Sequence, residues 1–196
     1  MSGSASRDLT DRSAVTVAGP AVPLRLAAHA AVASAVIGGV GVAFLVGMFT
    51  AFAVGARSQA LTLGWINDIL VLVSYPLVVP AALVIRSHVR PVAPLATDVA
   101  TAAGLAAVGA IAVLQALLLR GDLTFEEQIG PISIAFLAFG AWLVVIGRLG
   151  ARSGLLPGGV RMGLLGATYV GYPAWALWAA RRLGRATTHP NDPSDG

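Results

Sequence analysis

The chain contains neither cysteine nor lysine, so all 13 of its basic residues are arginines. Without cysteine it has no disulfide, no thiol nucleophile and no thiolate metal ligand. Charge is also scarce, because only 11% of the residues are Asp, Glu, Lys or Arg, against about 25% in an ordinary soluble domain. A formal net charge of +4 over 196 residues is not the basic face of a nucleic-acid-binding protein. These shortages exclude an ordinary soluble enzyme and a disordered chain.

The scarcity of charge leaves long uncharged, apolar runs. Five uncharged runs of 17 to 31 residues follow one another along the chain, and a helix that crosses the hydrocarbon core needs about 20 such residues. The sequence therefore predicts an all-α, polytopic transmembrane helix bundle over residues 26–185. Its five expected spans lie near residues 27–56, 66–86, 98–119, 129–148 and 162–181. Residues 1–25 and 186–196 are expected to be disordered tails.

Arginine placement predicts the orientation. If the N-terminus is cytoplasmic, eight arginines fall in inner segments and only Arg57 and Arg120 in outer loops, which is the usual bias. Five spans, however, leave Arg181 and the arginines after it outside. A re-entrant last segment, or a sixth span hidden in the first run, would remove this conflict. Five inner positions are expected to contact anionic lipid headgroups, namely Arg86, Arg90, Arg148, Arg152 and Arg161.

The first span carries small residues at every fourth position, including Ala35, Gly39, Ala43 and Gly47. In lipid, helices associate where small residues let their backbones approach closely. This row is predicted to pack against another helix of the bundle, or against a protein partner or a second copy of the chain. The alternative is that an Ala/Gly-rich segment forms such a row by chance.

The second span contains Pro76 and Pro80. Each proline removes a backbone donor and kinks the helix, either as a static feature or as a moving part. The last span ends with Tyr169, Tyr172 and Trp175 before a pair of arginines. Aromatic rings followed by arginine are typical of the membrane boundary, so these rings are expected to act as interfacial anchors.

The acidic residues are the candidates for chemistry, because ionisable groups near a membrane interior are costly and usually functional. Asp68 begins the second span, and Glu126 and Glu127 precede the fourth. We predict these three as catalytic acid and base groups. The alternative is that the loop acids are solvated and paired with Arg57 and Arg120. No cofactor motif and no metal-ligand spacing is present, and His29 lacks a second histidine nearby.

Residues 125–183 resemble a family of small bacterial, actinobacterial-type multipass membrane proteins of unknown function. The stretches that carry the resemblance are EQIGPI (127–132), RSGLLP (152–157) and YPAWALW (172–178). The resemblance implies a helical membrane protein in a bacterial plasma membrane, and it implies no activity.

Three functions fit these patterns. A non-catalytic membrane component or accessory subunit needs no polar constellation, and it is preferred for that reason. An enzyme acting on a lipid or isoprenoid would use Asp68 with Glu126 or Glu127. A small-solute transporter would use the proline-containing span, but the repeats that such proteins carry are not evident.

Overall fold

The computed structural model describes residues 22–188, and within that range the chain is helical with no β-strand. The all-α prediction is confirmed. In chain order the elements are α1 (Leu24–Ala53), α2 (Arg57–Ser74), the 3₁₀ turn η1 (Pro76–Val78), α3 (Val79–Val89), α4 (Pro94–Arg120), α5 (Phe125–Arg152), α6 (Gly159–Gly166) and α7 (Tyr172–Thr188).

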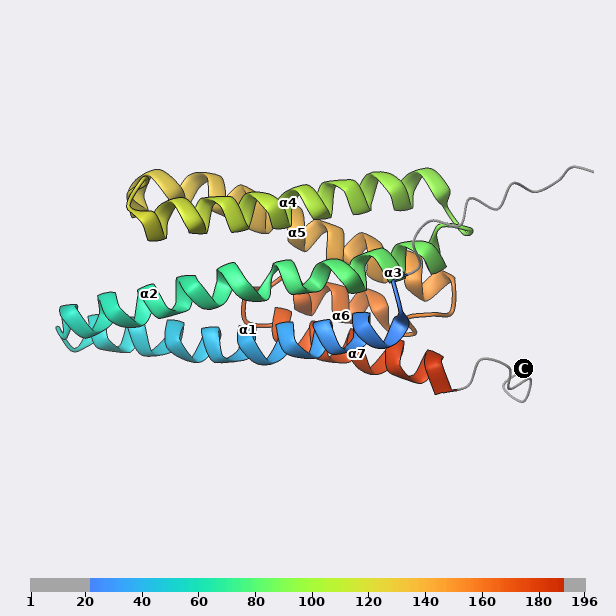
Figure 1. Ribbon diagram of the computed structural model, residues 1–196, viewed down its shortest axis with the longest axis horizontal. Coiled ribbons are helices and arrows are strands. Elements are labelled where there is room, and N and C mark those ends of the chain that lie inside the picture. Colours follow the sequence, from blue (N-terminus) through green and yellow to red (C-terminus); the bar gives the residue numbers. More distant parts are fainter. Residues whose placement is uncertain (1–21, 189–196) are drawn as a thin grey trace, which may run out of the picture.

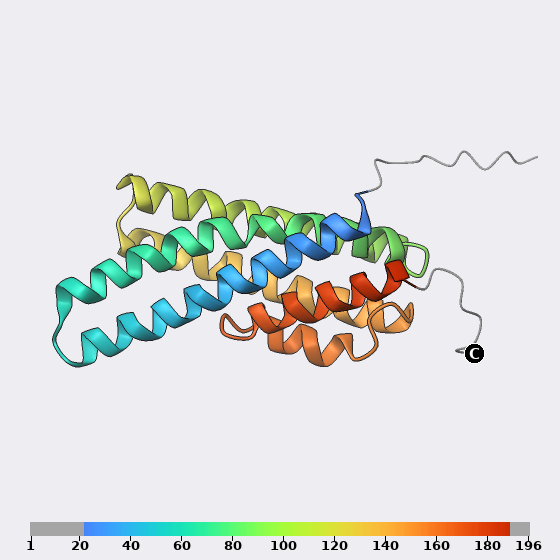
Figure 2. The ribbon, with the colours of Figure 1, turned by 60° about the horizontal axis from the view of Figure 1, so that its bottom comes forward.

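Four helices in this range are long and apolar enough to cross a membrane: α1, the combined segment Arg57–Val89, α4 and α5. They run alternately up and down the bundle, so α1 and α2 form one antiparallel hairpin and α4 and α5 form another (Figure 1). These four helices correspond to the first four predicted spans. The α1–α2 hairpin extends further than the α4–α5 hairpin at the end where both turns lie (Figure 2).

The second span breaks where its prolines predict a kink. Pro76 has no N–H, and the chain tightens into η1, where the Val78 N–H donates to the Tyr75 carbonyl. In a continuous α-helix that N–H would bond to the Ser74 carbonyl four residues back. The break therefore frees the Ser74 carbonyl for a side-chain partner.

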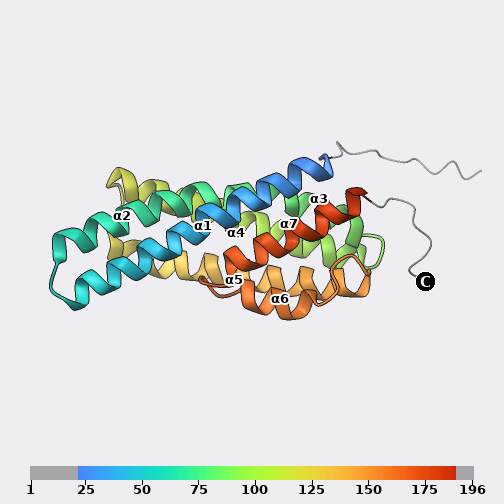
Figure 3. The same cartoon turned by 90° about the horizontal axis from the view of Figure 1, so that it is seen from below.

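The fifth predicted span, near residues 162–181, is not one continuous helix. It is divided between α6 and α7, with a turn over residues 167–171. The two short helices form a hairpin that occupies only half the length of the bundle (Figure 3). Within the described residues the structure thus has four helices of spanning length where five were expected. Glycines near positions 163–171 allow a turn there, and the uncharged run alone gave no sign of that turn.

The hairpin returns the chain to the end of the bundle where α1 begins (Figure 1). We call this the arginine-rich end, because nine of the eleven arginines among residues 22–188 lie there: Arg25, Arg86, Arg90, Arg148, Arg152, Arg161, Arg181, Arg182 and Arg185. The arginines of α7 therefore join the others rather than standing apart from them. This is the arrangement that a re-entrant last segment would give.

The predicted tails are only partly within the described residues. Leu24 and Arg25, assigned to the N-terminal tail, already belong to α1, and α7 continues to Thr188 within the predicted C-terminal tail. Residues 1–21 and 189–196 lie outside the described residues.

Candidate functional site

The turn between α6 and α7, residues 167–171, is the hairpin tip. The Thr168 hydroxyl donates to the Leu165 carbonyl at 2.7 Å and accepts from the Gly171 N–H at 2.9 Å. A Cβ at Gly171 would overlap the Leu165 carbonyl, so only glycine fits here. A threonine and a glycine therefore close the turn with short local hydrogen bonds.

Glycines also dock the hairpin on α5. A Cβ at Gly147 would overlap the Gly159 carbonyl, and a Cβ at Gly163 would overlap that of Leu143. Ala167 lies against Gly140, near the middle of α5 and about 18 Å from its C-terminal end at 1.5 Å per residue. Since the hydrocarbon core is about 30 Å thick, the hairpin tip reaches roughly half the depth of a bilayer. This backbone-to-backbone contact is the small-residue packing expected in lipid.

On its other side the hairpin packs along α1. Tyr172 and Pro173 begin α7 beside Gly38. The Ser34 hydroxyl is hydrogen-bonded to the Tyr172 hydroxyl and donates to the Ser74 carbonyl at 2.6 Å. Ser34 thus satisfies the carbonyl that the proline break frees, and the same hydroxyl ties the hairpin to α1 and α2. The proline break has a packing role in this structure.

Seven aromatic side chains from three segments surround the hairpin tip. Tyr75 stacks on Tyr172 with ring centroids 4.7 Å apart and meets the edge of Phe139 at 5.1 Å. The full cluster is Tyr75, Phe136, Phe139, Trp142, Tyr169, Tyr172 and Trp175. Offset and edge-to-face ring pairs of this kind add stability beyond their buried area. We call this set the aromatic cluster.

The expectation that the last aromatic residues anchor the membrane boundary is wrong for three of them. Trp175 is completely buried, Tyr172 is 2% exposed, and Tyr169 is partly buried with its hydroxyl bonded to Asn67 at 2.9 Å. They lie inside the bundle because α7 starts at mid-depth. The sequence carried one signal of this: glycines crowd the segment before Tyr172.

Asp68 lies in a short polar series outside the aromatic cluster. The Gln115 amide donates to the Asp68 carboxylate at 3.4 Å, and the Gln128 amide donates to the Gln115 carbonyl oxygen at 3.0 Å. Both glutamines are buried, and Asp68 is half-buried. Asp68 therefore has an amide partner from α4, and that amide is in turn bonded by Gln128 of α5, a series which the sequence did not suggest.

The two glutamates predicted to work with Asp68 have other positions. Glu127 closes a capping box at the start of α5, where its carboxylate accepts from the Thr124 N–H at 2.8 Å and the Thr124 hydroxyl accepts from the Glu127 N–H at 3.3 Å. Glu126 is exposed in the same turn. Within residues 22–188 no hydrogen bond or ion pair joins Asp68 to either glutamate.

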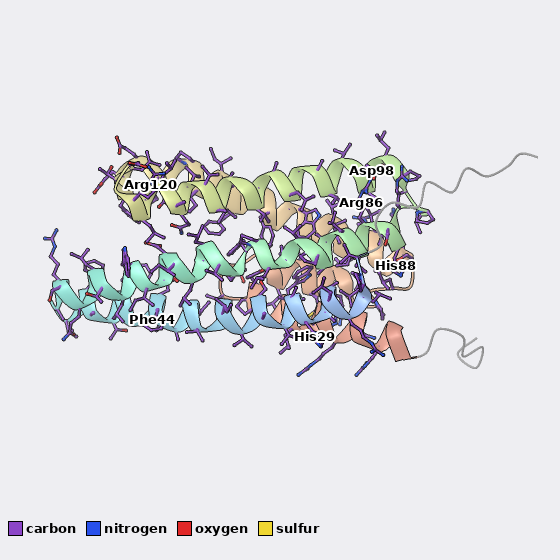
Figure 4. All side chains as sticks on the ribbon, viewed as in Figure 1. His29, Phe44, Arg86, His88, Asp98 and Arg120 are labelled. Carbon is purple, nitrogen blue, oxygen red and sulfur yellow. The ribbon has the colours of Figure 1, made fainter. Side chains whose placement is uncertain are left out.

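The remaining acids of the described range are paired with arginine. Asp98 bonds Arg86 at 2.7 Å and Arg90 at 3.1 Å at the arginine-rich end, and Asp122 bonds Arg120 at 3.1 Å at the opposite end. Figure 4 shows Arg86 and Asp98 together and Arg120 far from them. Pairing of a loop acid with Arg120 was one of the two alternatives for these residues.

The small-residue row of α1 divides between the interior and the surface. Ala35 is 6% exposed, whereas Gly39 and Ala43 are exposed, and Gly47 faces Leu63 of α2. Part of the row therefore packs inside the bundle. Gly39 and Ala43 remain the positions of this row that a partner helix can reach. His29 is exposed on the same helix.

Chemically, the hairpin tip offers hydroxyl and amide groups within an aromatic enclosure. No cluster of three or more His, Asp or Glu side chains suited to a metal occurs in the part of the chain that the structure describes. Phenol, serine and amide groups each donate and accept hydrogen bonds while carrying no charge themselves. Comparison of the chain with protein-family models, with curated proteins and with solved structures finds no match.

Proposed function

We propose that this protein is a multi-pass component of a bacterial plasma membrane that has no catalytic activity of its own and serves as a scaffold or accessory subunit. The four spanning helices support a membrane location, and the resemblance of residues 125–183 supports a bacterial one. The arginine-rich end faces the cytoplasm in this proposal, since positive loops favour that side.

The observation that carries the proposal is that most acidic residues of the described range have structural partners. Glu127 caps its own helix, and Asp98 and Asp122 are held by arginines. An acid–base enzyme needs two titratable groups that face one substrate, and Asp68 instead meets the amide of Gln115. Three of the five acids among residues 22–188 are therefore engaged in a helix cap or an ion pair, as expected of a structural component.

The proposed partner is another membrane helix that packs on α1. Gly39 and Ala43 are exposed, and beside them Val36 and Val40 are 60% and 44% exposed. Small residues flanked by β-branched ones allow close helix approach in lipid. Ala35 and Gly47 contribute less to this surface because they already pack within the bundle.

The structure favours only some of the five arginines that were predicted to contact anionic lipid headgroups. Arg86 and Arg90 bind Asp98, which neutralises part of their charge. Arg148, Arg152 and Arg161 are exposed at the α5–α6 junction and are the better positions for anionic headgroups, each contributing about 1 kcal/mol near such a surface.

The test is purification of the full chain in a mild detergent after cross-linking in cells. We expect a stoichiometric protein partner, and we expect Gly39→Leu with Ala43→Leu to remove it. Gly109→Leu with Ala110→Leu, on an exposed face of α4, is the matched control and should leave it in place. Loss of a cellular phenotype with both Asp68→Asn and Glu127→Gln, while the partner stays bound, would instead favour the lipid or isoprenoid enzyme.

A further inference from the structure

Two cavities meet at the hairpin tip. The larger one measures about 110 Å³ and is lined by four aromatic residues and three small ones: Tyr75, Phe136, Phe139, Tyr169, Gly166, Ala167 and Thr168. The smaller one measures about 10 Å³ and lies towards α1, where Tyr75 and Tyr169 line it again. A volume of 10 Å³ holds about one water molecule. The larger cavity has room for more than that, and its walls are mainly aromatic.

Tyr75 and Tyr169 line both cavities. Of these two, Tyr75 is the one whose hydroxyl has no hydrogen-bond partner among the described residues. Its side chain is 3% exposed. The hydroxyls of Tyr169 and Tyr172 bond Asn67 and Ser34, respectively, but the Tyr75 hydroxyl makes no hydrogen bond to any residue in the range 22–188. Unlike the fully enclosed polar atoms that lack a partner, the Tyr75 hydroxyl oxygen is open to its surroundings, so a group inside the adjoining cavity can reach it. An unused phenol on the wall of a cavity indicates a ligand group that accepts or donates a hydrogen bond there.

Other buried polar groups do not compete for this role. The indole N–H groups of Trp142 and Trp175 and the hydroxyls of Thr97 and Thr101 also have no partner among the described residues. None of these four side chains lines either cavity. Among residues 22–188, Tyr75 alone combines an unused hydrogen-bonding group with a position on the wall of the larger cavity.

The position of the larger cavity restricts its occupant. Ala167 and Thr168, which line it, are exposed. Ala167 lies against Gly140 near the middle of α5, which is the depth of the lipid chains if α5 crosses the bilayer. Ester carbonyls and charged headgroups of phospholipids lie at the edge of the hydrocarbon core, about 15 Å from its centre. A molecule that presents an oxygen at mid-depth must therefore be uncharged and dissolved in the bilayer.

We propose that the larger cavity binds an uncharged, membrane-dissolved lipophile whose carbonyl oxygen accepts a hydrogen bond from the Tyr75 hydroxyl. A benzoquinone-type ring fits this description, because it combines a planar apolar body for the aromatic walls with a carbonyl at its edge. The proposal goes beyond the proposed function, since it requires neither a protein partner nor catalysis.

The test uses the full chain, purified in detergent, with decyl-1,4-benzoquinone as the probe and native mass spectrometry to measure the complex. Decylbenzene, which has a planar six-membered ring and the same chain but no carbonyls, is the matched probe. We expect a one-to-one quinone complex whose dissociation constant rises at least tenfold in Tyr75→Phe, and we expect decylbenzene to bind at least tenfold more weakly. Phe136→Trp, which adds volume at the rim, should also prevent binding.

Two controls separate recognition from folding. Tyr75→Phe retains the ring, so its thermal midpoint should stay close to that of the unmodified chain. Ser34→Ala, at a residue that lines neither cavity, loses the bond to the Tyr172 hydroxyl and should lower the midpoint without weakening the quinone complex more than about threefold. Equal affinity for Tyr75→Phe and the unmodified chain, equal affinity for the two probes, or a retained phospholipid that the quinone does not displace would each overturn the proposal.

Discussion

The two halves of the bundle are built differently. Near the arginine-rich end, α1 and α3 bury residues on almost every turn, among them Ala27, Ala31, Ile85 and Val89. In the opposite half only Ala51 is buried in α1 after Gly41, and Phe49 and Leu61 are 61% and 60% exposed. The α6–α7 hairpin accounts for the difference, because it packs against the first half and ends at mid-depth. Short helices can therefore supply large buried side chains, such as Tyr172, Trp175 and Leu183, to the interior of one half of a membrane protein.

The first prediction distinguishes the halves by topology. Because the chain lacks cysteine, single cysteines at Ser58, Ser87 and Arg181, all exposed, can be labelled without background. A membrane-impermeant maleimide should label Ser58→Cys on intact cells, and should label Ser87→Cys and Arg181→Cys only after permeabilisation. Labelling of Arg181→Cys together with Ser58→Cys would mean that residues 162–181 cross the membrane.

The second prediction loosens the hairpin from α5. Gly147→Ala places a methyl group against the Gly159 backbone, and backbone cannot move aside as a side chain can. We expect a loss of about 3 kcal/mol in the free energy of unfolding, measured by denaturant titration in mixed micelles. Gly109→Ala, which meets nothing within 4 Å, should be neutral or slightly stabilising. Similar losses in both variants would contradict the close packing.

The third prediction concerns the hydroxyl that joins the hairpin to the proline break. Ser34→Ala leaves the Ser74 carbonyl and the Tyr172 hydroxyl without their partner, and we expect a loss of about 2 kcal/mol. Ser133→Ala removes a hydroxyl that bonds only to its own exposed helix turn and should change stability by less than about 0.5 kcal/mol. Ser34→Ala and Tyr172→Phe should be non-additive, because they remove the same bond.

The smallest effect is expected in the half that lacks the hairpin. Thr124→Ala removes the capping box of α5, with a loss of about 1 kcal/mol by the same titration. Thr62→Ala, whose hydroxyl bonds to the Ser58 carbonyl of its own helix, is the control and should have less effect. A loss larger than that of Ser34→Ala would show that the opposite half is the more tightly coupled one.

Charge spacing predicted the helical class and the first four spans, because those helices follow the uncharged runs. It could not predict the α6–α7 turn, since Gly166 and Gly171 interrupt a helix without adding charge. The proline break was predicted from Pro76 and Pro80, but its role in packing was not. The carbonyl that it frees belongs to Ser74 and accepts from the hydroxyl of Ser34, forty residues earlier in the chain.

The site was predicted less well than the fold. Asp68 as a catalytic acid or base stays a prediction, and the sequence did not indicate its partner Gln115 on α4 or the Gln128 side chain of α5 that bonds Gln115. Tyr172 and Trp175 were assigned to the boundary because rings next to arginines usually lie there. Tertiary contacts place them inside: Tyr172 packs beside Gly38 of α1, and Trp175 packs against Trp142 of α5.

The brevity of α6 has a consequence for how the protein is made. A helix of eight residues is about 12 Å long, too short for insertion machinery to release it into lipid as a span. We expect α1 to α5 to enter the bilayer first and to present an open groove towards the cytoplasm. The segment from Gly159 onward then folds into that groove from the side on which it is synthesised, and its arginines do not have to be translocated. In this order of assembly the α6–α7 hairpin binds to an already inserted α1–α5 bundle. The two parts, made as separate polypeptides, should therefore reassemble.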